Sequence, residues 1–400
     1  MMGRYALGLG LGCALMTAAA SAPVRAAEEA PPLPLVEGLD RIGLGKPMTD
    51  AGITAGGWVE ASYTLNLTNW STGPLAGRVF DVKAQDPTLN QTVLYVERAV
   101  DPSKGKFDLG FRIEGLYGSD GRFIHANGLN FYGGDSPQIY PENQLDLTQA
   151  YVDVAIPVGS GLKVRAGKMV THMGYETINP NNDPLYSHSY LFGFAIPFTH
   201  TGVMAFYNIN DRVSVMGGIS RGWEQSLKDN NEMIDFLGQL AWKTSDKLTL
   251  TLGTVIGPEA TDNNSDYRSV VDLILSYAAT DKLSFALNGD YGYESDAAAD
   301  GSDAQWYGVA GYAGYKITDM MTLQGRLEWF SDPDGARGLD TNVYEATVGL
   351  NIKPFPNAKY VSGLIFRPEI RYDYSEDAIF GDDGGDHNQV TLGGDVILNF

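Results

Sequence analysis

The chain has 400 residues, of which 48 are glycine and only 19 % are charged, so it is richer in glycine and poorer in charge than an ordinary soluble domain. Its formal net charge is −21, with 28 basic residues against 49 acidic ones. A nucleic-acid partner needs a surface rich in lysine and arginine, so the acidic balance argues against that class of function. The single cysteine excludes an internal disulfide and a cysteine metal site.

Residues 1–26 have the pattern of a secretory signal peptide. Arg4 gives a basic start, residues 6–20 form an apolar run that includes Cys13, and small residues before Ala26 offer a cleavage site. The run is about 15 residues long, whereas a membrane-spanning helix needs roughly 20. A transmembrane anchor is therefore the weaker alternative.

Residues 27–55 are rich in proline and glycine and are interpreted as a periplasmic linker, with at most a short helix around residues 36–42. No later segment is long and apolar enough for a membrane-spanning helix. From residue 56 to residue 400, apolar and polar side chains alternate instead, as Val59, Ala61 and Tyr63 do against their polar neighbours. This period of two predicts strands with one apolar and one polar face.

The connections between these strands alternate in length. Short turns such as residues 244–247 and 280–282 are separated by eight long polar stretches. Outer-membrane β-barrels divide their periplasmic turns and extracellular loops in this way. The sequence therefore predicts an all-β, antiparallel, up-and-down transmembrane barrel at residues 56–400, with 16 strands and with 14 or 18 as alternatives. A secreted β-sandwich is the less favoured fold. The strands are expected to begin near Gly57, Val93, Phe107, Thr148, Leu162, Thr201, Val213, Phe236, Leu248, Val270, Leu283, Trp306, Met321, Val343, Leu364 and Val390.

The last predicted strand alternates from Val390 onward, and the chain stops on Phe400. A C-terminal amphipathic strand ending in phenylalanine resembles the assembly signal of bacterial outer-membrane proteins. We therefore expect the barrel-assembly machinery and outer-membrane lipid to be partners.

Two stretches of sequence resemble a known family. Residues 56–63 (GGWVEASY) resemble its first strand. Residues 168–176 (KMVTHMGYE), 179–182 (NPNN) and 187–202 (SHSYLFGFAIPFTHTG) resemble the signature of the β-barrel porin-2 (OmpL-like) family. The resemblance covers essentially the whole chain after the leader. It implies a bacterial outer-membrane porin but does not supply a solute.

The loop at residues 171–198 is rich in aromatic residues and proline and has only two acids, Glu176 and Asp183. So apolar a segment is not expected to stand free in water. It follows the fifth strand, where general porins carry a loop that folds into the channel. We interpret it as the constriction loop, with Tyr186 and Tyr190 as further candidate residues. The alternative is a loop packed on the barrel rim or on a neighbouring subunit.

Charged side chains on the predicted strands must face the lumen, because a Lys or Arg facing lipid near mid-membrane costs roughly 2 to 4 kcal/mol. On the fifteenth strand a stiffening ladder of ion pairs is favoured over a role in selectivity. The candidate pore-lining residues are Arg112, Glu114, Lys163, Arg165, Arg326, Glu328, Arg367, Glu369, Arg371 and Asp373.

A search for catalytic and metal-binding patterns favours neither. The five histidines lie in loops or at strand ends and lack the spacing of a zinc protease. Residues 187–189 (SHS) imitate a nucleophile and base, but neighbouring strand residues point to opposite faces. The acidic stretches 332–335 and 382–386 lack the spacing of an EF-hand. We expect no cofactor, no metal and no catalytic residue.

The sequence thus predicts an outer-membrane porin for passive diffusion of small hydrophilic solutes and ions. Its long loops carry 27 acids against seven bases, which predicts weak cation selectivity. The alternatives are a structural or adhesive barrel and, less favoured, a barrel with lipase or protease activity. A homotrimer is compatible with the sequence, which does not decide the oligomeric state.

Overall fold

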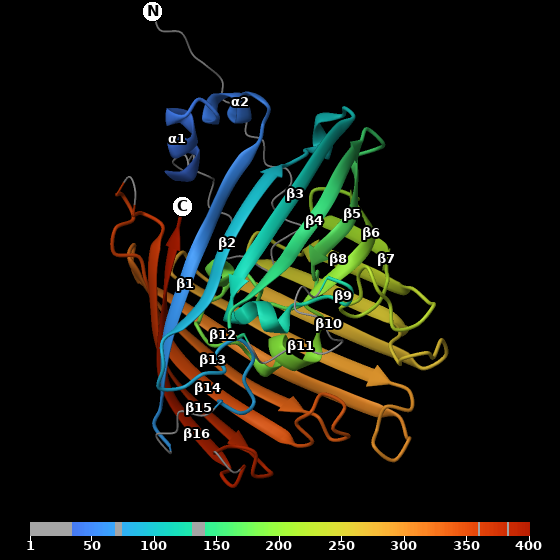
Figure 1. The fold of residues 1–400 in the computed structure, drawn as a ribbon, viewed down its shortest axis with the longest axis vertical. Coiled ribbons are helices and arrows are strands. Elements are labelled where there is room, and N and C mark those ends of the chain that lie inside the picture. The colour runs from blue at the N-terminus through green and yellow to red at the C-terminus, as the bar shows by residue number, and fades with distance from the viewer. Residues whose placement is uncertain (1–33, 69–73, 130–140, 359–360, 382–383) are drawn as a thin grey trace, which may run out of the picture.

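The computed structural model describes residues 34–68, 74–129, 141–358, 361–381 and 384–400, so the expected signal peptide lies outside the described residues. Sixteen antiparallel strands form one closed barrel in which every strand pairs with its sequence neighbours and β1 pairs with β16 (Figure 1). The first eight are β1 Thr54–Asn66, β2 Thr88–Arg98, β3 Asp108–Gly118, β4 Gln144–Ile156, β5 Leu162–Val170, β6 Thr199–Asn208, β7 Val213–Ser220 and β8 Asp235–Lys243. The others are β9 Leu248–Pro258, β10 Tyr267–Ala278, β11 Leu283–Glu294, β12 Ala304–Thr318, β13 Met321–Ser331, β14 Asn342–Ile352, β15 Leu364–Ser375 and β16 Asn388–Asn399.

The strands bury their polar face and expose their apolar face, which is the reverse of a soluble sheet. On β15, Arg367 and Arg371 are buried, whereas Ile370 and Tyr372 are 50 % and 44 % exposed. A barrel in lipid needs this arrangement, because apolar side chains meet the hydrocarbon and polar ones turn inward.

The sequence prediction of 16 strands is confirmed, and most strands begin within three residues of the expected position. The largest difference is at β2, which begins at Thr88 rather than near Val93. Its first residues are polar except Leu89. Gln91 turns inward and donates hydrogen bonds to Asp120 (3.0 Å) and to the carbonyl oxygen of Ile178 (2.8 Å). At the start of β2, polar residues that bind loop residues interrupt the alternation of apolar and polar side chains, so the sequence pattern places the strand start too late.

The barrel closes where β1 pairs with β16, and Phe400 makes the first hydrogen bonds of this pairing. Its amide donates to the carbonyl oxygen of Gly57 at 3.0 Å, and the Gly57 amide donates to the carbonyl oxygen of Phe400 at 2.9 Å. From there β1 and β16 pair in register from Trp58 with Asn399 to Asn66 with Thr391.

The segment before β1 contains two short helices, α1 Pro34–Arg41 and α2 Gly45–Asp50. They lie at the same end of the barrel as the C terminus (Figure 1), which the short-turn rule identifies as the periplasmic end. None of the helices in the described part of the chain is long and apolar enough to cross a membrane.

Candidate functional site

The loop at residues 171–198 lies inside the barrel. The Tyr186 hydroxyl donates to Ser62 Oγ on β1 at 2.9 Å, so this part of the loop touches the inward face of the first strand. Further along, the carbonyl oxygen of Ala195 accepts a hydrogen bond of 3.1 Å from Trp306 Nε1 on β12. The loop therefore covers the wall made by β12–β16 and β1, which we name the covered wall.

Carboxylates of the covered wall bind backbone amides of the loop. Glu369 on β15 accepts from the amides of Tyr186 (2.8 Å) and Ser187 (3.1 Å). Glu328 on β13 accepts from the amides of Tyr190 (2.7 Å) and Leu191 (2.8 Å). Each carboxylate thus satisfies two buried N–H groups that the irregular backbone of the loop cannot pair itself.

Arginines of the same wall bind the loop carbonyls. Arg367 Nη1 donates to the carbonyl oxygens of Pro180 (2.7 Å), Asp183 (3.1 Å) and Leu185 (2.9 Å). Arg326 Nη1 donates to the carbonyl oxygen of Ser187 at 2.7 Å, and Arg371 Nη1 donates to that of His188 at 2.5 Å. The fork geometry of guanidinium lets one side chain hold several carbonyls.

Six of the ten candidate pore-lining residues therefore face inward but lie under the loop. Each of these six residues is at most 5 % exposed: Arg326, Glu328, Arg367, Glu369, Arg371 and Asp373. Their ion pairs join the wall to itself as well, as Arg367 does with Asp395 and Arg326 with Glu345. They anchor the loop, and the sequence pattern alone could not show what covers them.

The loop residues singled out from the sequence are all buried among these anchors. Glu176 Oε1 accepts from Arg326 at 2.6 Å, and this guanidinium lowers the pKa of Glu176 although burial alone would raise it. Asp183 accepts from the amide of Thr177 and pairs with His188 at 3.2 Å. The Tyr190 hydroxyl donates to Asp373 at 2.8 Å.

The first long loop, which follows β1, also turns inward, and the sequence analysis did not single out its residues. Arg78 is buried between Asp81 and Asp373, with 2.8 Å from its Nη2 to Asp373 Oδ2. The Phe80 ring lies 5.0 Å from the ring of His188 and 5.4 Å from that of Phe192. The available signal was an apolar, arginine-containing run in a loop expected to be in water.

A second inward contact comes from the loop between β7 and β8. The Glu224 carboxylate accepts from the amides of Phe198 and Thr199 and from the Thr199 hydroxyl (2.8 Å). Burial raises the pKa of Glu224 to about 7. Because several loop acids are buried in this way, Asp81, Asp120 and Asp332 among them, the extracellular mouth carries less free charge than the sequence count of acids indicates.

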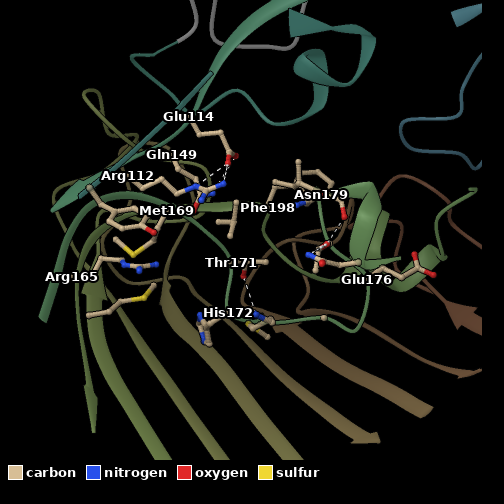
Figure 2. Close-up of a pocket in the computed structure, with 18 of the residues that line it drawn as sticks. Arg112, Glu114, Gln149, Arg165, Met169, Thr171, His172, Glu176, Asn179 and Phe198 are labelled. Atoms are coloured by element: carbon tan, nitrogen blue, oxygen red, sulfur yellow. Dashed lines mark hydrogen bonds and ion pairs between the residues drawn. The ribbon is translucent and has the colours of Figure 1, made fainter. Parts of the chain in front are cut away.

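The opposite wall, made by β2–β6 and named here the cavity wall, borders a cavity of about 270 Å³. Figure 2 shows Arg112, Glu114, Gln149 and Arg165 on one side of this cavity and Asn179 of the loop on the other. The lining is half apolar, with aromatic and methionine side chains from both sides: Trp58, Met169, Met173, Phe192, Phe198, Met204 and Phe206.

The charges of the cavity wall are paired, mostly between neighbouring strands. Arg112 Nη1 lies 2.5 Å from Glu97, and Arg112 Nε lies 3.0 Å from Glu114. Arg165 makes a two-point contact with Asp153, at 2.8 and 2.9 Å. Lys163, the remaining candidate, lies on the same wall with its ammonium 4.4 Å from the centre of the Phe206 ring.

The guanidinium groups of Arg112 and Arg165 also lie over aromatic rings. Arg112 is 4.2 Å from the centre of the Tyr95 ring, and Arg165 is 3.6 Å from that of Tyr151. Packing on a ring fixes the guanidinium plane and favours a charge that is partly removed from water. The four candidates Arg112, Glu114, Lys163 and Arg165 are thus brought together on one side of the lumen.

Among the described residues, no group of three or more His, Cys, Asp or Glu is placed to hold a metal ion.

Residues 52–400 match the family described as Putative beta-barrel porin-2, OmpL-like. The chain belongs to this family. The porin fold, the closed barrel and the family together place the protein in the bacterial outer membrane as a passive channel. No curated protein matches the sequence.

Solved porin structures share the fold at low sequence identity. The anion-selective porin from Comamonas acidovorans is 13 % identical, with a TM-score of 0.58 over 87 % of this chain and 99 % of that one. OmpT of Vibrio cholerae, in its trimer form, is 12 % identical, with a TM-score of 0.54 over 87 % and 99 %. OprB of Pseudomonas putida is 14 % identical, with a TM-score of 0.54 over 90 % and 97 %. At this identity the likeness concerns the barrel alone.

Proposed function

We propose that this porin carries small hydrophilic solutes and ions past a constriction formed by loop 171–198. The observation that supports the constriction is the anchoring of the loop across the lumen by Glu328, Glu369 and Arg367. A loop held at so many points narrows the barrel permanently on the covered wall and leaves the path beside the cavity wall. A barrel of 16 strands is otherwise wide enough to hold water.

The proposal includes weak cation selectivity. Exposed acids remain at the loop tips, for example Asp300, Asp303 and Glu376, whereas the basic side chains of the cavity wall are paired with carboxylates. An acidic mouth concentrates cations within a Debye length. The fold is shared with a porin whose title calls it anion-selective, so the shape of the barrel does not decide the sign.

We further propose that the barrel is not an enzyme. In the part of the chain that the structure describes, the arrangement closest to a catalytic triad is Asp183–His188 beside Ser187. Within the described residues, His188 Nδ1 has no hydrogen-bond partner, and Ser187 Oγ is bonded to Arg326 at 3.3 Å instead. A serine nucleophile needs the imidazole as its base, so the geometry favours a structural role for all three residues.

The remaining proposals concern partners. We propose that the barrel-assembly machinery recognises Phe400, the last residue after β16. A homotrimer is proposed because one porin of the same fold is described in a trimer form.

Conductance of purified, folded protein in a planar bilayer tests the channel and its constriction together. We expect a measurable ion current, and we expect deletion of residues 179–194 to enlarge the single-channel conductance several-fold, because the anchored part of the loop is removed. The full-length protein is the control. A complete lack of current would contradict the channel, and an unchanged conductance of the folded deletion variant would contradict the constriction.

A further inference from the structure

The cavity wall carries charges of alternating sign on four neighbouring strands. Glu97 on β2 pairs in register with Arg112 on β3, and Asp153 on β4 pairs in register with Arg165 on β5. Neighbouring strands lie about 4.8 Å apart, so opposite charges face each other at that spacing within each pair. Between the two pairs, Arg112 is in register with Tyr151, and Asp153 is in register with Gly110. A molecule beside either pair meets both signs within a few ångströms.

The two ends of this row have unused hydrogen-bonding capacity. Arg165 uses Nε and Nη2 on Asp153, and in the described part of the chain its Nη1 makes no hydrogen bond. Glu97 receives Arg112 on Oε2, its Oε1 accepts no hydrogen bond from any described residue, and its side chain is 31 % exposed. One open donor and one open acceptor therefore border the same cavity.

Apolar side chains form much of the remaining cavity lining, beside polar ones such as Asn179 and Thr171. Trp58 on β1 and Phe192 and Phe198 of the loop border the cavity, and Met169 and Met204 add apolar surface on β5 and β6 of the cavity wall itself. Water and inorganic ions gain nothing from such a surface, whereas an organic side chain is stabilised by leaving water there. The volume of about 270 Å³ is near the lower end of the roughly 300 to 1,000 Å³ usual for small-molecule sites.

We propose that this cavity binds small zwitterionic solutes with an apolar body, of which an α-amino acid with a large side chain is the simplest example. The ammonium and carboxylate groups lie against the alternating row, and the body lies against the aromatic and methionine side chains. The row is close to neutral, because Glu97, Glu114 and Asp153 balance Arg112, Lys163 and Arg165. A solute with a single charge therefore satisfies only half of it. The inference rests on the proposed function, since it takes the cavity to border the path of diffusing solutes.

Calorimetric titration of the purified barrel in detergent tests the ligand class with four probes. L-phenylalanine has both charges and an apolar body; 3-phenylpropionate and phenethylamine each lack one charge, and glycine lacks the body. We expect L-phenylalanine to bind at least tenfold more tightly than each of the others. Equal binding of 3-phenylpropionate would overturn the alternating-charge argument, and equal binding of glycine would overturn the role of the apolar lining. Binding by none of the four would overturn the proposal as a whole.

A double variant tests the place of binding without leaving a charge unpaired. Arg165→Gln with Asp153→Asn removes one ion pair of the row, and we expect at least a tenfold loss of L-phenylalanine affinity. Arg268→Gln with Glu294→Gln removes a pair of the same 2.8 Å geometry between β10 and β11, outside the cavity, and should leave affinity unchanged. If both double variants behave alike, the row is not the site.

Ion current in a planar bilayer, measured on the same preparations, separates this proposal from the channel itself. A folded protein that conducts ions but does not distinguish the four probes contradicts only the zwitterion site. A folded protein without current contradicts the channel, whatever it binds.

Discussion

The covered wall and the cavity wall present the same kinds of side chain to the lumen, arginines beside carboxylates. On the covered wall, Arg326 and Arg371 reach past their carboxylate partners to the backbone of loop 171–198. On the cavity wall, Arg112 and Arg165 stop at their carboxylates and at aromatic rings, and the cavity lies beyond them. One residue pattern thus serves as an anchor where a loop lies over it and as a solute-facing surface where none does.

The largest expected effect comes from breaking the covered wall at Arg326. Its guanidinium is fully buried between Glu176 and Glu345, so Arg326→Gln removes the cation from Glu176 and leaves Glu345 only with Arg371, 4.0 Å away. Removing one partner of a buried pair costs about 3 to 5 kcal/mol. We expect a loss of that size in the free energy of unfolding, measured by denaturant titration in detergent.

Arg112→Gln on the cavity wall is the matched control. Its partner Glu97 is 31 % exposed, and Glu114, although buried, borders the same cavity, so water can reach both carboxylates after the change. We expect a cost of about 1 kcal/mol, as for partly exposed ion pairs. Equal destabilisation by the two variants would show that burial by the loop does not distinguish the walls.

How far the sequence predicts these walls depends on which interaction decides each feature. The period of two on strands such as β15 is local, so strand number, strand positions and the inward direction of Arg367 and Glu369 could be read directly. The 16-strand barrel and the family were predicted for this reason.

The covering of the walls depends on contacts between residues far apart in the chain. Nothing near Arg78 in the sequence reveals that it pairs with Asp373, and nothing near Glu328 reveals that it binds the amide of Tyr190. The loop acids show the same limit: Asp332 looks like a solvated loop acid but is buried and accepts from the amides of Arg337 and Leu339. Long-range pairing, not residue type, separates an anchor from a pore-lining group.

Deletion of Phe400 tests the seam between β1 and β16, which closes the barrel within the covered wall. The change removes the pair of hydrogen bonds with Gly57 that ends the β1–β16 ladder. We expect barrel assembly in cells to slow several-fold, followed as the appearance of the heat-modifiable folded form after a pulse of synthesis. Phe400→Tyr, which keeps the aromatic ring and the backbone bonds, should assemble normally. Normal kinetics of the deletion variant would contradict the assembly signal.

A smaller effect is expected from Glu224, which ties the end of loop 171–198 to the loop before β8. Burial raises the pKa of Glu224 to about 7, above the roughly 4.3 of an unfolded chain. The folded state therefore binds the proton more tightly, so the stability linked to this group is full below about pH 4 and is lost as the pH rises through 7. We expect the melting temperature to fall by a few degrees between pH 5 and pH 8.

Glu224→Gln separates this carboxyl from the other titrating groups. Glutamine keeps an oxygen for the amides of Phe198 and Thr199 but does not titrate. The variant should therefore have a flatter dependence of melting temperature on pH than the wild type. Parallel curves for the two proteins would show that Glu224 is already ionised, or already protonated, throughout this range.

The smallest expected effect is ion selectivity, where the extracellular mouth and the cavity wall oppose each other. Exposed loop acids such as Asp300 and Glu376 attract cations, and the Debye length of about 10 Å at 0.1 M salt lets them act across the mouth. The arginines Arg112 and Arg165 act in the opposite sense, but their partners Glu97 and Asp153 cancel most of their field at a distance. The mouth therefore decides the sign at low salt.

The reversal potential in a KCl gradient measures this balance. We expect weak cation preference near 0.1 M that declines toward 1 M. At 1 M the Debye length is about 3 Å, so the potentials of the charges at the mouth no longer overlap. The double variant Asp300→Asn with Glu376→Gln should reduce the preference, since the cavity wall is unchanged in it. Anion preference of the wild type at 0.1 M would mean that Arg112 and Arg165 set the field in spite of their partners, because they stand closest to the path of the ion.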